Sequence, residues 1–168
     1  MKNTIKFIAA KAVNTSAKVI FCAIFGAFIG FSATARDNIA DVAVKDAWVR
    51  ATVPGQKGTG AFMSITAKSD LSLVGASSAV AGVTEVHEMK MNGDVMQMRA
   101  VTSVDLPAGK AVALQPGGFH VMLLDLKTAL PKNVTVPLTL LFKDAKGVAS
   151  KVELTVPVAT AAPNQHKH

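Results

Sequence analysis

Residues 83–98 read VTEVHEMKMNGDVMQM, and this stretch carries the strongest local structural signal in the chain. Two runs rich in strand-forming residues flank Asn92-Gly93, a dipeptide that favours the two-residue type I′ turn of a β-hairpin. The expected cross-strand pairs are Met91 with Asp94, Met89 with Met96, and His87 with Met98. Residues directly opposite in an antiparallel pair share a face, so one surface would present one histidine and four methionines. A larger turn would shift the register by two residues and keep the same face.

The rest of the chain beyond residue 40 also predicts short strands. Apolar residues tend to alternate there, and turns with glycine or proline recur about every 8–12 residues, a pattern typical of an all-β sandwich or barrel. The expected strands are 42–50, 61–68, 72–77, 83–91, 95–104, 111–114, 120–126, 134–142 and 148–158. We therefore expect one β domain over residues 36–158 and a flexible polar tail over residues 159–168.

The first 35 residues are typical of a secretory signal peptide rather than of a folded element. Four lysines and no acid precede an apolar run over residues 19–31, and a small-x-small site ends at Ala35. The run is shorter than the roughly 20 residues that a membrane-spanning helix needs. Cys22, the one cysteine, lacks the small preceding residues of a lipid-attachment site. We expect export, cleavage after Ala35, and no membrane span in the cleaved protein.

Charge and composition narrow the function classes. The 168 residues carry a net charge of +7, but four of the eighteen basic residues and none of the eleven acids lie in the expected signal. The remaining chain has a net charge of only +3, and the protein has no tyrosine. Without a basic stripe or tyrosines for base stacking, nucleic-acid binding is not expected. Without a cysteine, the cleaved protein could form neither a disulfide nor a thiolate metal site.

The methionines and histidines are concentrated in one part of the sequence. Five of the seven methionines lie between residues 89 and 122, and two of the four histidines, His87 and His120, bracket this window. His120 and Met122 stand two residues apart on a predicted strand and would share a face. Soft thioether ligands select Cu(I), whereas zinc and iron proteins prefer thiolate, imidazole or carboxylate ligands. The pattern therefore indicates a Cu(I) site, although methionine is also a common core residue.

The spacing His87-x10-Met98-x21-His120-x-Met122 resembles the signature of the PCu(A)C family of periplasmic copper chaperones. The resemblance covers about residues 42–158 and includes AWVR at 47–50 and PGGFHVML at 116–123. It implies a cupredoxin-like Greek-key β-sandwich in the periplasm that binds one Cu(I). It also implies a non-enzymatic carrier that delivers copper toward the CuA centre of cytochrome c oxidase, alongside SCO-type thiol proteins. The implied ligands are His87, Met98, His120 and Met122.

Several alternatives stay open at this point. Met89 and Met96 lie outside the core signature and are auxiliary or shielding candidates, and His166 and His168 in the tail are candidates for loose Cu(II) capture. The same ligands would serve a copper-buffering or resistance protein without a dedicated acceptor. A methionine-rich face could also dock an apolar partner. A blue-copper electron carrier requires a cysteine ligand, which the cleaved chain lacks. We expect a monomer.

Overall fold

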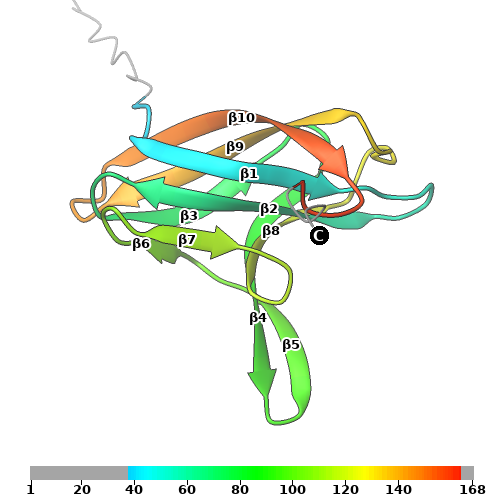
Figure 1. The fold of residues 1–168 in the computed structure, drawn as a ribbon, viewed down its shortest axis with the longest axis horizontal. Helices are drawn as coiled ribbons and strands as arrows, with labels where there is room; N and C mark the ends of the chain where they lie inside the picture. Colours follow the sequence, from blue (N-terminus) through cyan, green and yellow to red (C-terminus); the bar gives the residue numbers. More distant parts are fainter. Residues whose placement is uncertain (1–37, 164–168) are drawn as a thin grey trace, which may run out of the picture. The chain divides into compact units, whose positions relative to one another are not determined.

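The computed structural model describes residues 38–163, which form an all-β domain (Figure 1). Its ten strands are β1 (Val42–Arg50), β2 (Gly58–Ala67), β3 (Leu71–Ser77), β4 (Val83–Asn92), β5 (Val95–Ala100), β6 (Val104–Leu106), β7 (Ala111–Leu114), β8 (Phe119–Leu124), β9 (Thr135–Asp144) and β10 (Ala149–Ala159). Within residues 38–163 there is no helix long and apolar enough to cross a membrane. The expected signal peptide and the histidines of the tail lie outside the described residues.

Hydrogen bonds join the strands in the order β5-β4-β8-β2-β1-β10-β9-β3-β6, and β7 also pairs with β2. The parallel pairing of β1 with β10 connects the two halves of this arrangement. Ile65 and Val121 come from one half and Leu140 and Phe142 from the other, and all four are buried in a single apolar core. The two halves thus pack face to face as layers, which confirms the predicted all-β, cupredoxin-like Greek-key sandwich.

One predicted strand was wrong in extent. Residues 95–104 form not one strand but two, because the chain changes layers at residues 101–103. The first of these, β5, pairs with β4, whereas β6 pairs with β3 in the other layer. The alternation of apolar residues continues across this crossing, so the sequence pattern does not mark it.

The β4–β5 hairpin extends beyond the rest of the sheet (Figure 1). Residues 83–88 of β4 pair with β8, whereas residues 89–92 pair only with β5. Every residue of β5 is exposed to solvent. In the outer half of the hairpin, each strand therefore pairs only with the other, and no apolar core lies beneath them.

The predicted register of this hairpin was wrong by two residues. Asn92 pairs with Val95, so the turn residues are Gly93 and Asp94, and of these only Gly93 has a positive φ, at 61°. A type I′ turn needs positive φ at both central residues, whereas glycine at the first position alone suits a type II′ turn. The observed pairs are Met91 with Met96, Met89 with Met98, and His87 with Ala100. A shift of two residues preserves the face, so the histidine and the four methionines still share one surface.

Candidate metal centre

The predicted ligands lie on the outer face of the sheet and not in the core between the layers. On β8, Val121 and Leu123 point into the core, so the alternating His120 and Met122 point outward. On β4, Val86 is buried in the core, which places His87 on the same outward face. Strands β4 and β8 pair directly, with His87 opposite His120. Two neighbouring strands thereby bring both imidazoles together.

His120 is held by a backbone carbonyl that determines which ring nitrogen is free. Its Nδ1 lies 3.0 Å from the carbonyl oxygen of Gly118, an acceptor, so Nδ1 carries the proton. In the neutral ring Nε2 then has a free lone pair, and it lies 3.3 Å from the sulfur of Met98. Burial is the main cause that lowers the pKa of His120 below its ordinary value, and electrostatic interactions with His87 and Arg50 lower it further, against the effect of the Gly118 hydrogen bond. The neutral, metal-binding form of the ring is therefore favoured.

The Gly118 carbonyl is positioned by the turn between β7 and β8. The amide of Gly118 donates a hydrogen bond to the carbonyl of Gln115 at 3.0 Å, with Pro116 and Gly117 as the central residues. Gly117 has φ +85°, and proline followed by a residue with positive φ is the signature of a type II turn. The amide of Met89 donates to the same Gly118 carbonyl at 3.1 Å. One carbonyl thus connects the base of the hairpin with His120.

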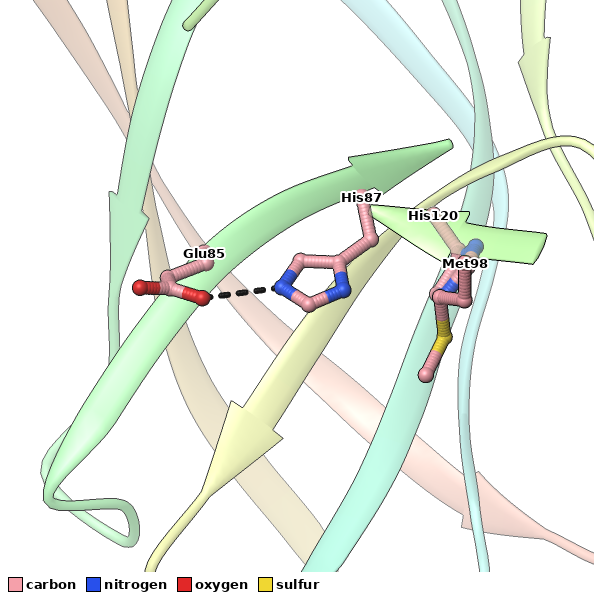
Figure 2. A network of polar contacts seen from close by, with 4 residues as sticks. All are labelled: Glu85, His87, Met98 and His120. Atoms are coloured by element: carbon pink, nitrogen blue, oxygen red, sulfur yellow. Dashed lines mark hydrogen bonds and ion pairs between the residues drawn. The ribbon is translucent and has the colours of Figure 1, made fainter. Parts of the chain in front are cut away.

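His87 presents the opposite ring nitrogen to the cluster. Its Nε2 lies 2.8 Å from a carboxylate oxygen of Glu85, so Nε2 carries the proton. Its Nδ1 is buried and has no hydrogen-bond partner. Figure 2 shows this nitrogen on the side of the ring that faces His120 and Met98, and the two imidazole centroids are 6.0 Å apart. A buried acceptor without a partner is costly for a protein and is expected where a ligand completes the site.

The other donor side chains line a small pocket of about 170 Å³. Its lining includes Met98, His120 and Met122, three of the four predicted ligands, together with Met89. His87 adjoins it through its contact with His120. Phe62 forms an apolar wall, with its ring centroid 6.2 Å from that of His120. The pocket therefore has soft donors on one side and an aromatic ring on another.

The Phe62 wall depends on a glycine in the same strand. A Cβ atom added to Gly60 would lie 2.7 Å from the ring of Phe62, closer than packed atoms approach. The Phe62 ring also stacks on Trp48, with centroids 4.8 Å apart. Phe62 can therefore flank His120 only because residue 60 has no side chain.

These donors fit a soft monovalent ion. Nε2 of His120 and the sulfur of Met98 lie 3.3 Å apart, so a single ion could contact both atoms. Among residues 38–163 there is no group of three or more His, Cys, Asp or Glu side chains that could hold a metal. The donors that converge are imidazole and thioether, which suit Cu(I).

The two auxiliary candidates lie in different places. Met89 lines the pocket, whereas Met96 pairs with Met91 farther out on the hairpin and is half exposed. Their role as ligands stays a prediction, as does that of the four core candidates. Sequence reasoning assigned no role to Glu85 or to the Gly118 carbonyl. Glu85 stands two residues from His87, a spacing that keeps both on one strand face and could have drawn attention to it.

Comparisons with known proteins identify the family. The sequence model of the family described as "Putative lipoprotein LpqE-like" matches residues 42–158. "Putative lipoprotein Lxx21020" of Leifsonia xyli subsp. xyli is 32% identical over 127 residues, which is 75% of each chain. The chain belongs to the LpqE-like family. The match spans all strands from β1 to nearly the end of β10, so it includes every predicted ligand of the pocket.

Solved structures similar to this LpqE-like protein include PCuAC domains. The apo PCuAC domain from PmoF1 aligns with a TM-score of 0.59 and 24% identity, over 74% of this chain and 98% of that domain. The solution structure of Cu(I)-DR1885 from Deinococcus radiodurans aligns with a TM-score of 0.53 and 27% identity, over 76% and 83%. The resemblance to the PCu(A)C family predicted from the sequence is thereby confirmed.

Proposed function

We propose that this LpqE-like protein is a copper chaperone that binds one Cu(I) through His87, Met98, His120 and Met122. The observation that carries the proposal is the arrangement of free donor atoms around the pocket. Nε2 of His120 lies 3.3 Å from the sulfur of Met98, and the buried Nδ1 of His87 lacks a partner on the adjoining strand. The similar structures include a copper-bound PCuAC domain from PmoF2 and Cu(I)-DR1885, which supports the choice of ion.

Each side chain has a distinct part in holding the ion. His120 donates through Nε2 and His87 through Nδ1, because their other nitrogens are engaged by Gly118 and Glu85. Met98 and Met122 supply neutral sulfur donors. Four neutral ligands keep the monovalent ion without the tight, redox-sensitive hold of thiolates. A fully ligated Cu(I) also leaves no position for a water molecule, so the protein acts as a carrier and not as an enzyme.

We further propose that the protein is exported to the periplasm and delivers copper toward the CuA site of cytochrome c oxidase. The oxidase subunit, an SCO-type thiol protein, or both would accept the ion, because a thiolate binds Cu(I) more tightly than a thioether does. The family relationship supports a location in the cell envelope. The alternative is a copper-buffering protein with the same site and no dedicated acceptor.

The decisive experiment combines copper competition with X-ray absorption. We expect one Cu(I) per chain against a calibrated chelator, with both nitrogen and sulfur scatterers in the absorption spectrum. The double variant His120→Ala with Met122→Ala should lose this affinity while remaining folded by circular dichroism. Equal affinity in the variant and the wild type would contradict the proposal.

Transfer separates the carrier from the buffer. The Cu(I)-loaded protein is mixed with an apo CuA domain, with and without a reduced SCO-type protein. A carrier transfers its ion to the acceptor faster than the chelator complex does at matched free copper. Transfer no faster than from the chelator would favour the buffering alternative.

The tail constitutes a separate, weaker proposal. His166 and His168 would capture Cu(II) loosely. Deletion of residues 163–168 followed by Cu(II) titration tests this role. Unchanged stoichiometry and affinity would remove the tail from the mechanism.

A further inference from the structure

The two faces of the β4–β5 hairpin have opposite chemistry. One face bears an ion pair between Glu88 and Arg99, with a shortest distance of 2.8 Å, and a contact of 3.4 Å between the amides of Asn92 and Gln97. The other face bears two cross-strand methionine pairs in succession, Met89 with Met98 and Met91 with Met96. No charged residue of either strand lies between the methionine pairs on that face.

The pocket divides the two methionine pairs into an inner one, which lines it, and an outer one, which does not. Met91 and Met96 are 54% and 49% exposed, and they lie near the turn, where the hairpin stands clear of the sheet (Figure 1). The inner pair lies closer to the body of the domain, and both of its members line the pocket. A row of thioethers therefore leads from the solvent to Nε2 of His120.

We propose that Met91 and Met96 form a second, outer Cu(I) site through which copper enters and leaves the inner site. This inference rests on the proposed function, because it takes the pocket as the destination of the ion. Two opposed residues in an antiparallel pair have Cβ atoms about 4.5–5.5 Å apart, which allows two methionine sulfurs to bind one ion between them. With only two neutral ligands, the outer site binds Cu(I) weakly and exchanges it quickly.

The transfer itself is a ligand exchange. Successive pairs on one face are separated by two residues, or about 7 Å along the strand. Methionine is unbranched and has three rotatable bonds, so an inner sulfur can reach toward the ion before an outer one releases it. A bond from copper to Met89 or Met98 forms, and a bond to Met91 or Met96 breaks. Copper stays Cu(I) throughout, and no proton moves.

The distribution of methionine favours this interpretation over a plain apolar docking patch. All four positions on the outer part of this face are methionine, and Met63, which is 3% exposed, is the one methionine among the described residues that lies in the apolar core. If the patch needed only apolar character, leucine or valine would fill these positions equally well. What the four side chains share beyond apolar character is a soft sulfur donor.

The proposal is tested with the double variant Met91→Leu with Met96→Leu, which keeps the apolar volume and removes both sulfurs. Equilibrium affinity for the first Cu(I) should stay within about twofold of the wild type, because Met91 and Met96 do not line the pocket. The rate of loading from a Cu(I)–chelator complex should fall by about tenfold, because the local concentration of ligands is lost. Stopped-flow absorbance of the chelator gives this rate.

Methionine methyl NMR gives an independent readout with Ag(I), a redox-inert substitute for Cu(I). In the wild type, the first equivalent of Ag(I) should shift the methyl signals of Met98 and Met122. Further Ag(I), bound more weakly, should then shift the methyl signals of Met91 and Met96. The Leu variant assigns the outer signals by their loss. Outer methyl signals that do not move up to several equivalents would overturn the proposal.

Controls separate the possible causes. Val95→Leu changes an exposed apolar residue on the opposite face and should load at the wild-type rate. Met91→Ser with Met96→Ser removes sulfur and apolar character together, and should load as slowly as the Leu variant. Slower loading in the Ser variant but not in the Leu variant would overturn the proposal in favour of an apolar docking patch. Loading of the Leu variant at the wild-type rate would overturn it as well. Failure of the proposed function itself would appear differently, as equal Cu(I) affinity of the wild type and the His120→Ala, Met122→Ala variant.

Discussion

Strands β2 and β5 belong to one hydrogen-bonded arrangement and both carry methionine, yet their surroundings are opposite. Met63 on β2 is 3% exposed and packs in the core between the layers, whereas Met98 on β5 is 51% exposed. The same side chain acts as core filler in one strand and as a candidate ligand in the other. The difference follows from what lies beneath each strand, since β2 has the second layer under it and the outer hairpin has none.

A strand without a core must be held by other interactions. β5 receives backbone hydrogen bonds from β4 alone, and the guanidinium of Arg99 donates two hydrogen bonds to one carboxylate oxygen of Glu88, at 2.8 and 3.2 Å. The Arg99–Glu88 contacts lie on the polar face, so they do not involve the methionine side chains of the other face. The contacts that stabilise the hairpin and the proposed copper ligands thus lie on different faces, and substitutions can separate the two roles.

The largest effect should come from the core methionine. Met63→Ala removes a buried side chain and leaves a cavity, which should lower the free energy of unfolding by about 2–5 kcal/mol. Met98→Ala, at an exposed position, should change it by no more than about 0.5 kcal/mol. Urea unfolding of the apo proteins gives both values. Equal destabilisation by the two substitutions would break the contrast between the two strands.

Copper affinity should respond to substitution of Met98 and not to substitution of Met63, the reverse of the order expected for stability. Met98→Leu removes a sulfur donor that lies 3.3 Å from Nε2 of His120, and Cu(I) affinity should fall by about 100-fold, or about 2.7 kcal/mol. Met63→Leu, the matched control in the core, should leave affinity unchanged. Chelator competition measures both. Loss of affinity in the core variant would show that folding and not ligation limits binding.

Glu85 should have a smaller effect on binding than a direct ligand. Its carboxylate accepts a hydrogen bond from Nε2–H of His87, and removal of such a partner typically costs about 10–100-fold in metal affinity. Glu85→Ala should fall in this range. Glu85→Gln keeps an oxygen that can accept the same hydrogen bond and should lose less affinity. Identical affinities for Ala and Gln variants would contradict a positioning role.

The smallest effect should come from the polar face of the hairpin. Arg99→Ala removes an exposed ion pair, and such pairs contribute about 0.2–1 kcal/mol. The loss should appear as faster hydrogen exchange of hairpin amides, with little change in global unfolding. Cu(I) affinity should be nearly unchanged, because Arg99 and the methionines occupy opposite faces.

Much of the fold was predictable from local pattern. The period of two along each strand gave the all-β class and most strand bounds, because alternation reports the face that is buried. The pattern could not show that residues 101–103 cross between layers, since both resulting strands continue the same alternation. It also could not determine the turn, because Asn92-Gly93 and Gly93-Asp94 are both acceptable central pairs.

The sequence by itself determined which donors share a surface. His87, Met89, Met91, Met96 and Met98 lie on one face in either register, because a shift of two residues preserves side-chain parity. The tertiary structure alone decided which nitrogen of each imidazole is free, which methionines stand next to His120, and which aromatic ring borders the pocket. These properties depend on contacts distant in sequence, from the Gly118 carbonyl on the β7–β8 turn and from the Phe62 ring on β2. Local propensity carries no information about such contacts, since they form only when separate strands pack together.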